Sequence, residues 1–109
     1  MIRRQHRFHG LHALAFAYKN GKTIRGKEIS LRYVLNTRQS QWRAAVVVSK
    51  KVHKSAVVRN RLRRQMYEVI RMSPQPTANY DLIFTIHSPD AQPPEAVDLL
   101  LRAGVITKM

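Results

Sequence analysis

The chain has 109 residues and carries 20 Lys and Arg against 6 Asp and Glu, a formal net charge of +14. Its length suits a single domain over residues 1–109, and a hydrophobic share of 44% argues against a disordered basic tail. Cysteine is absent, which excludes disulfides and thiolate metal sites. So positive a chain attracts polyanions. Because no long apolar span favours a membrane, nucleic acid is the expected partner.

The charge is concentrated in the middle of the chain. Between Glu28 and Glu68 there is no acid but there are ten Lys or Arg. From Met72 to Leu101 there is no Lys or Arg, and this stretch holds four of the six acids, namely Asp81, Asp90, Glu95 and Asp98. Such segregation is typical of a directed binding face and not of charge scattered for solubility.

The first part of the chain predicts a helix followed by a strand. Amphipathic spacing indicates a helix from about Phe8 to Tyr18, ended by Asn20-Gly21. The helical spacing makes a cleaved targeting segment the less favoured interpretation of the acid-free first 27 residues. Glu28 to Leu35 alternates as a half-buried strand does, and a partner strand is expected to begin near Thr23.

The middle of the chain predicts a strand and a long helix. Trp42 to Ser49 is apolar on both faces and is therefore expected at the centre of the sheet. Ser55 is a suitable N-cap for a helix that ends near Met72, and on this helix Glu68 can pair with Arg64. The apolar residues of this helix form one arc: Val58, Leu62, Met66, Val69 and Ile70.

The last part predicts a further strand and helix. Tyr80 to His87 is another strand that is apolar on both faces. Pro93-Pro94 opens a helix from Glu95 to Ala103, closed by Gly104. Its inward residues are expected to be Val97, Leu100 and Leu101. The unit of strand, basic helix and strand predicts a βαβ crossover between parallel strands, right-handed by the general rule.

The residues for protein-based catalysis are few. No Ser lies in a Gly-x-Ser-x-Gly elbow. His6, His9 and His12 spread too widely around a helix to hold a metal ion without further ligands. The later acids are distributed over a strand, a loop and a helix, whereas a two-metal nuclease needs convergent carboxylates. We expect Asp81 to end a strand and the helical acids to complement their helix N-terminus, so an autonomous nuclease is disfavoured.

The run from Ser49 to Arg64 carries the strongest functional signal, with seven Lys or Arg among sixteen residues. A helix that is merely solvated interleaves acids at i, i+4, and only Glu68 does so here. Asn60 adds an amide that can bind a base edge or a 2′-hydroxyl, or else cap the helix or face solvent. Tyr33 offers a surface for stacking unpaired bases if its face of the sheet is uncovered. We expect four arginines to contact nucleic acid: Arg59, Arg61, Arg63 and Arg64.

The segment Val46-Val47-Val48-Ser49-Lys50-Lys51, followed by Arg59-Asn60-Arg61-Leu62-Arg63-Arg64, resembles the protein subunit of bacterial ribonuclease P. Looser similarity covers nearly the whole chain in element order. The resemblance implies an α+β fold, a two-layer α/β sandwich with a mixed sheet and a left-handed crossover, against the general rule. It implies a leader-binding cleft between the sheet and the first helix, with Tyr18 and Tyr33 only approximately at its aromatic positions. The RNA-binding residues that it implies are Lys50, Lys51, Lys54, Arg59, Asn60, Arg61, Arg63 and Arg64.

The resemblance also implies a cytoplasmic accessory subunit with no active site of its own. Its partners would be the ribonuclease P RNA, which cleaves and works with Mg²⁺, and the 5′ leader of precursor tRNA. No DNA, membrane or protein-bound cofactor is expected. The turn Val52-His53-Lys54-Ser55 and the residue Leu14 depart from the family pattern, in loop geometry and in one leader contact. Without the motif, a structural RNA-binding protein of the ribosomal type fits the same residues.

Overall fold

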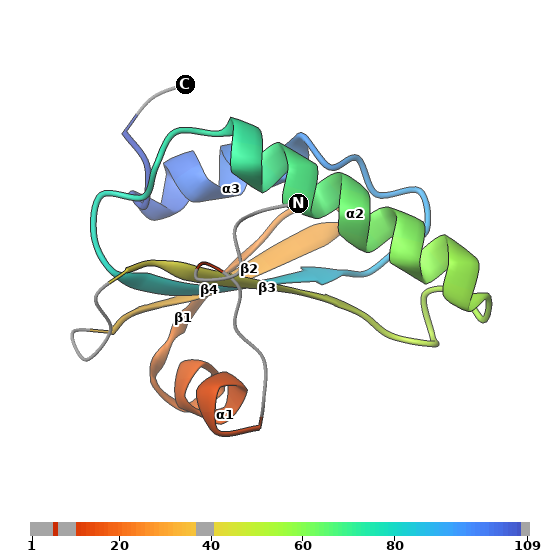
Figure 1. Cartoon of the computed structure of the whole chain (residues 1–109), viewed down its shortest axis with the longest axis horizontal. Helices are drawn as coiled ribbons and strands as arrows, with labels where there is room; N and C mark the ends of the chain where they lie inside the picture. Colours follow the sequence, from red (N-terminus) through yellow and green to blue (C-terminus); the bar gives the residue numbers. More distant parts are fainter. Residues whose placement is uncertain (1–5, 7–10, 37–40, 108–109) are drawn as a thin grey trace.

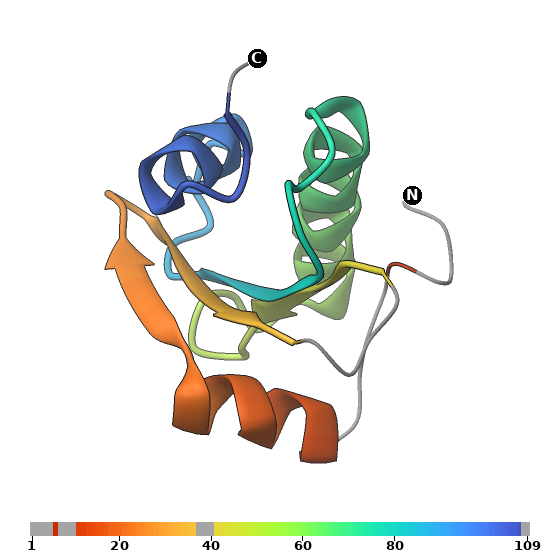
Figure 2. The ribbon, with the colours of Figure 1, turned by 90° about the vertical axis from the view of Figure 1, so that its left-hand side faces the viewer.

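The computed structural model describes residues 6, 11–36 and 41–107 and contains a four-stranded sheet with three helices. Helices α2 and α3 lie on one face of the sheet, and α1 lies on the other (Figures 1 and 2). The α+β class is confirmed, and α1 adds a partial third layer that a two-layer sandwich lacks. The elements in chain order are α1 (Leu11–Asn20), β1 (Lys22–Arg25), β2 (Ile29–Leu35), β3 (Arg43–Val48), α2 (Ala56–Met72), β4 (Tyr80–Ile86) and α3 (Glu95–Ala103).

The strand order is β1-β2-β4-β3, which makes the sheet mixed. Strands β3 and β4 are parallel, as the predicted crossover requires, while β1 with β2 and β2 with β4 are antiparallel. The partner strand expected near Thr23 is confirmed as β1. The prediction that the Trp42 to Ser49 strand is central is wrong, because β3 lies at the edge of the sheet and β4 takes the inner position.

Strand β3 is apolar at its edge position because other elements cover it. The backbone N–H of Val46 donates to the hydroxyl of Tyr67 at 3.2 Å, and the guanidinium of Arg63 donates to the carbonyl of Val48 at 3.3 Å. Both of these side chains come from α2. One N–H and one carbonyl of this edge therefore have side-chain partners, and α2 covers that part of the strand.

The sheet buries a large apolar core on its α2/α3 face and a small one on its α1 face. Alternation along β2 and β4 sends Ile29, Leu31, Leu82 and Phe84 to the α2/α3 face, where all four are fully buried. On the α1 face the buried apolar cluster of the described residues consists of Ala17, Ala45 and Ile83. The stable body of the fold is therefore the sheet with α2 and α3.

Helix α2 begins and ends close to its predicted bounds. Ser55 has extended backbone angles, and its hydroxyl accepts from the N–H of Val58 at 3.4 Å, as an N-cap does. The buried residues Leu62, Met66 and Ile70 confirm the predicted apolar arc. The pairing of Glu68 with Arg64 that the spacing allows is not formed between these described residues. Glu68 instead accepts from Arg71, one turn toward the helix C-terminus, at 2.6 Å.

Helix α3 closes at Gly104, whose φ of 77° is the left-handed conformation that glycine favours at this position. Its buried residues are Ala96, Leu99 and Leu100. Of the predicted inward residues, Leu100 is buried, and Val97 and Leu101 are half-buried and pack against the same core. Glu95 lies against the β1–β2 turn, where its carboxylate accepts from the N–H of Glu28 at 3.2 Å. A side chain at Gly26 would collide with this carboxylate and with the carbonyl of Ile29.

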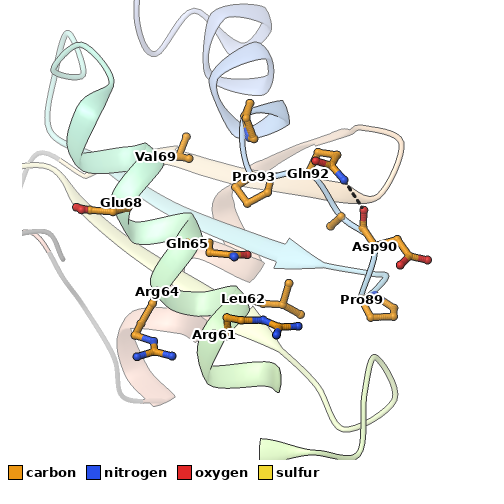
Figure 3. A pocket seen from close by; sticks show the side chains of 12 residues that line it. Arg61, Leu62, Arg64, Gln65, Glu68, Val69, Pro89, Asp90, Gln92 and Pro93 are labelled. Atoms are coloured by element: carbon orange, nitrogen blue, oxygen red, sulfur yellow. Dashed lines mark hydrogen bonds between the residues drawn. The ribbon is translucent and has the colours of Figure 1, made fainter. Parts of the chain in front are cut away.

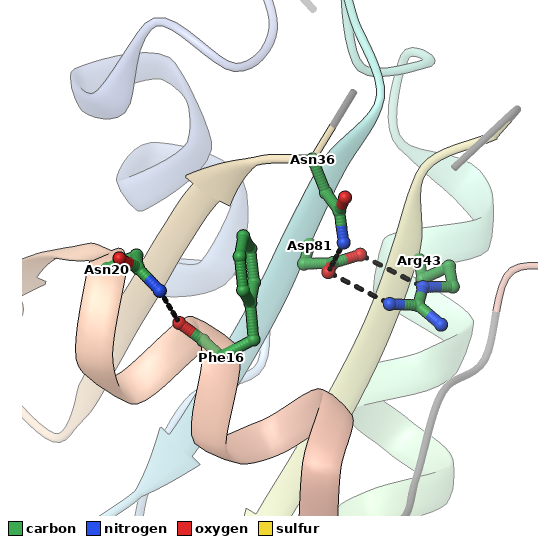
Figure 4. Close-up of polar contacts among 5 residues, drawn as sticks. All are labelled: Phe16, Asn20, Asn36, Arg43 and Asp81. Carbon is green, nitrogen blue, oxygen red and sulfur yellow. Dashed lines mark hydrogen bonds and ion pairs between the residues drawn. The ribbon is translucent and has the colours of Figure 1, made fainter. Parts of the chain in front are cut away.

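The prediction that Asp81 ends a strand is wrong. Asp81 lies inside β4, and its side chain is fully buried. Its carboxylate accepts from Arg43 at 3.0 and 2.9 Å and from the amide of Asn36 at 2.8 Å. Figure 4 shows these three side chains converging from β3, β4 and the end of β2, with Phe16 of α1 nearby. A buried carboxylate needs such partners, so the cluster ties three strands together on the α1 face.

Helix α1 is held to the sheet through Arg32 of β2. Arg32 donates to the carbonyl of Ala17 at 3.1 Å, to the carbonyl of Tyr18, and to the hydroxyl of Thr23 at 2.7 Å. Carbonyls at the last turn of a helix lack intrahelical partners, and a guanidinium satisfies them while complementing the helix dipole. The sequence prediction started this helix at Phe8, which lies outside the described residues, and ended it two residues early.

Candidate nucleic-acid interface

The predicted cations lie on the β3–α2 loop and on the first half of α2. The side chains of Lys50, Lys51 and Lys54 are exposed along the loop. The motif residues on α2 fall into two groups, because Arg59 and Arg63 are half-buried while Asn60, Arg61 and Arg64 are exposed. The structure therefore places all eight predicted RNA-binding residues on one continuous segment, and these residues differ in how exposed their side chains are.

Arg59 organises the loop that precedes the helix. Its guanidinium donates to the carbonyl of His53 at 2.9 Å and to that of Lys54 at 3.0 Å. The ring Nδ1 of His53 accepts from the N–H of Ser55 at 3.0 Å. The turn that departs from the family pattern is thus a hydrogen-bonded unit, and Arg59 holds Lys54 at a fixed place beside the helix.

Arg63 connects the helix to the edge of the sheet. It donates to the side-chain carbonyl of Asn60 at 2.6 Å and to the backbone carbonyl of Val48 at 3.3 Å. The first contact uses the side-chain carbonyl of Asn60 as acceptor and leaves its amide N–H groups without a partner among the described residues.

Arg61 and Arg64 differ from the other two arginines. Neither makes a hydrogen bond or ion pair with another side chain or carbonyl in the described part of the chain, and both are exposed. A cluster of guanidiniums without acidic partners is favourable only when an anion neutralises it. These two residues are the part of the motif that is most available to phosphate.

A groove of about 830 Å³ lies between α2 and the loop that precedes α3, and Figure 3 shows the side chains that line it. One wall is α2, which contributes Arg61, Arg64 and Gln65, and the other wall is the loop from Pro89 to Pro94. The floor is apolar, since Leu62 and Ala91 are buried. The α2 wall carries two arginines and Glu68, and the proline-rich loop wall carries Asp90, so side chains of both charges line the groove.

The basic surface ends at Glu68. Its hydrogen bond with Arg71 lowers the pKa of Glu68 and raises the pKa of Arg71, so both stay ionised. An exposed ion pair of this kind contributes little to stability. Its effect here is local, because it removes Arg71 from the set of unpaired cations on α2.

The structure separates the two tyrosines that were expected to share a leader cleft. Tyr18 is exposed on α1, with 47% of its surface accessible. Tyr33 pairs in register with Leu82 and packs against the core on the α2/α3 face, edge to face with Tyr80. The expectation that Tyr33 lies beside the first helix is therefore wrong, because strand alternation sends Arg32 to that face instead.

Sequence reasoning missed two residues that shape this region. Tyr67 lies one turn beyond Arg63, and its hydroxyl accepts from the edge of β3 as described above. Arg32 occupies the position beside α1. The spacing of Tyr67 from Arg63 on one helical face was a usable signal, whereas nothing local to Arg32 indicated its contact with a helix fifteen residues earlier.

Of the three histidines considered for a metal site, His6 is the one whose side chain lies in the described part of the chain. His6 stacks on Trp42 at 4.0 Å between ring centroids, and its Nδ1 lies 2.8 Å from the Trp42 carbonyl oxygen. His9 and the side chain of His12 lie outside the described part. Within that part, no group of three His, Asp or Glu is placed to hold a metal ion, and none of its helices has the length and apolarity to cross a membrane.

Comparison with known proteins gives a consistent result. The family model described as "Ribonuclease P" matches residues 2–102. A relative named "Ribonuclease P protein component" from Pseudanabaena sp. (strain PCC 6903) is 37% identical over 71 residues, covering 65% of this chain and 61% of the relative. One of the same name from Thermus oshimai is 35% identical over 85 residues, covering 78% and 54%. The chain thus spans a little over half the length of these curated relatives.

Solved structures agree on the fold. The ribonuclease P protein from Staphylococcus aureus superposes with a TM-score of 0.77 at 20% identity, covering 100% of this chain and 97% of that one. The ribonuclease P protein from Thermotoga maritima superposes with a TM-score of 0.64 at 19% identity, covering 83% and 86%. At such identities the likeness concerns the arrangement of helices and strands.

Proposed function

The chain belongs to the ribonuclease P protein family, and from that membership we propose that it is the accessory subunit of a ribonucleoprotein that matures tRNA. It binds a catalytic RNA and helps that RNA to remove the 5′ leader from precursor tRNA by endonucleolytic cleavage. The observation that carries this proposal is the pair of exposed arginines on α2, Arg61 and Arg64, which have no partner among the described residues. RNA phosphates supply the neutralising charge.

The four arginines of the motif have two different roles. Arg61 and Arg64 contact the RNA directly. Arg59 positions the loop, and Arg63 positions Asn60, for contact with the RNA. Three exposed lysines, Lys50, Lys51 and Lys54, extend the same surface along the loop. A phosphate contact should lower affinity by a similar amount for any RNA sequence, whereas loss of a positioning residue should also change the loop.

The chemistry of cleavage belongs to the RNA in this proposal. Hydrolysis with Mg²⁺ needs carboxylates or phosphates that converge on the ion. Asp81, Glu95 and Asp98 do not converge in this way, because Asp81 is buried against Arg43, Glu95 accepts from Glu28, and Asp98 lies 3.8 Å from Arg102. Mg²⁺ would therefore be held by RNA phosphates, and the protein cations would lower the amount of the ion that the RNA needs.

The single-stranded leader is proposed to lie along the α1 face of the sheet. The exposed ring of Tyr18 offers a stacking surface there, and Phe16 is half-buried between α1 and the Asp81 cluster (Figure 4). Stacking on aromatic rings tolerates any base, as leaders of varied sequence require. Tyr33, on the other face, supports the core in this proposal.

The test is reconstitution with a bacterial ribonuclease P RNA and a precursor tRNA at low Mg²⁺. The purified protein alone should leave the precursor intact, and its addition should restore accurate 5′ cleavage by the RNA. The double variant R61Q/R64Q should reduce the salt dependence of RNA binding by about one unit of log–log slope for each arginine. The single variant R71Q removes a paired cation from the same helix and should change that slope less.

Two outcomes would overturn the proposal. RNA binding without any stimulation of cleavage would point to the alternative, a structural RNA-binding protein of the ribosomal type. Cleavage by protein free of RNA would show that the chain carries an active site of its own.

A further inference from the structure

A second hollow, of about 450 Å³, lies on another face of α2, next to the edge of β3. Its lining residues recur at helical spacing, and none of the five is acidic: Val57, Asn60, Arg63, Arg64 and Tyr67. Figure 3 shows the Arg64 guanidinium on the side of α2 that faces away from the groove described above. The hollow therefore combines an aromatic ring with a cation that has no partner among the described residues.

Two of the lining side chains are held against the sheet. The hydroxyl of Tyr67 accepts from the N–H of Val46 at 3.2 Å, and its half-buried ring packs against the core. Arg63 donates to the carbonyl of Val48 at 3.3 Å and to the amide oxygen of Asn60 at 2.6 Å. Side chains that are already ordered lose little conformational entropy when a ligand binds, so this part of the hollow is preorganised.

The hollow also exposes apolar surface among its cations. Val57, in the first turn of α2, is 74% exposed, and the ring of Tyr67 lines the same hollow two to three turns further along the helix. Cations alone attract the phosphates of paired and unpaired RNA alike. Apolar and aromatic side chains gain nothing from phosphates, but they do gain from contact with the faces of bases, which unpaired nucleotides expose.

We propose that this hollow takes an unpaired segment of the catalytic RNA, with one base stacked on the ring of Tyr67 and a phosphate at Arg64. This inference rests on the proposed function, and it makes Tyr67 a further RNA-binding residue. Arg63 has donors only and therefore takes the amide oxygen of Asn60. The amide N–H groups of Asn60 are left for an acceptor on the RNA, such as the keto oxygen of uracil or guanine.

The decisive experiment compares Y67F and Y67L by their dissociation constants for a bacterial ribonuclease P RNA, with the folded fraction measured by circular dichroism. Phe keeps the ring and removes the hydroxyl, whereas Leu keeps an apolar side chain and removes the ring. Per folded molecule, Y67F should bind within about twofold of the unmodified protein. Y67L should bind roughly fivefold to a hundredfold more weakly, as expected for the loss of one stacked base.

The salt dependence separates stacking from charge. Stacking releases no counterions, so Y67L should keep the log–log salt slope of the unmodified protein, whereas R64Q should lower that slope by about one unit. The matched control is Y80L, which removes another half-buried ring that packs against the same core but does not line the hollow. Y80L should leave the RNA affinity per folded molecule unchanged.

A pair of cross-linking positions on α2 locates the RNA. Val57 and Met72 lie at opposite ends of the helix and are exposed to a similar extent, 74% and 73%. A photo-reactive benzoylphenylalanine in place of Val57 should cross-link to an unpaired nucleotide of the catalytic RNA. The same group in place of Met72 should not.

The inference fails on any of three results. The first is an affinity of Y67L, per folded molecule, equal to that of the unmodified protein. The second is an equal loss in Y67F and Y67L, which would assign the effect to the hydroxyl that binds β3. The third is cross-linking from position 57 to base-paired RNA alone. Failure of the unmodified protein to bind the RNA at all would instead refute the proposed function, so the two failures are distinguishable.

Discussion

The two faces of the sheet are built by different means. Among the described residues, eighteen buried apolar side chains form the cluster on the α2/α3 face, whereas three form the cluster on the α1 face. The α1 face is held instead by polar contacts, through Arg43 and Asn36 to Asp81 and through Arg32 to the end of α1. Apolar burial is strong and tolerant of geometry, while hydrogen bonds are directional and contribute less. One face therefore carries stability and the other can adapt to a ligand.

The largest expected effect tests where stability resides. Phe84 and Ile83 are neighbours in β4, both fully buried, but they point to opposite faces. F84A should lower the free energy of unfolding by about 3–5 kcal/mol, and I83A by about 2 kcal/mol, because the smaller cluster can collapse around the lost volume. Urea unfolding followed by Trp42 fluorescence measures both. Equal losses would mean that the two faces contribute alike.

The second prediction concerns the buried carboxylate of the α1 face. D81A should lower the free energy of unfolding by roughly 1.5–3 kcal/mol, the range for hydrogen bonds to charged groups. The loss should fall short of that for a fully buried pair, because 20% of the Arg43 side chain is accessible and water can reach it. The control is D98A, which removes an exposed pair and should change stability by about 0.3–0.5 kcal/mol. A D81A protein as stable as D98A would show that the cluster contributes no net stability.

The third prediction separates the faces by function. In the reconstituted complex, Y18A should weaken binding of a precursor tRNA with a leader of several nucleotides by roughly 1–3 kcal/mol, with little change for mature tRNA. Y33A should weaken both to the same extent per folded molecule, since Tyr33 packs on the opposite face. The measurement is the ratio of the two affinities at one salt concentration. If Y33A weakened binding of the precursor tRNA but not of mature tRNA, Tyr33 would be a leader-binding residue after all.

The smallest expected effect concerns the attachment of α1. R32M keeps an unbranched apolar stem but removes the guanidinium and its donors, and should cost about 0.3–1 kcal/mol, the usual value of a cation at a helix C-terminus. Amide hydrogen exchange should quicken in α1 and remain slow in β4 and α2. Uniform acceleration across the whole chain would show that α1 is not a separable unit.

The sequence predicted elements well where the pattern was local. The bounds of α2 and α3 followed from Ser55, from the Pro93-Pro94 pair and from Gly104, each of which acts on its own backbone. The prediction of an inner position for β3 was wrong. An apolar pattern shows that both faces of a strand are covered, but it does not show whether a second strand pairs with its edge. The separation of the arginines into bonded and unpaired groups also depended on distant carbonyls, such as that of Val48.

The edge of β3 has a consequence for self-association. An edge strand with free backbone groups can recruit the same strand of another molecule, and a chain of Val and Ala is well suited to that pairing. Tyr67 and Arg63 occupy one backbone donor and one acceptor, at Val46 and Val48, through which an incoming strand would bond. The other edge, β1, carries Lys22 and Arg25, whose like charges discourage close approach of a second copy. When a polyanion binds many copies of this protein at high local concentration, we therefore expect the copies to stay separate and not to pair through their sheet edges.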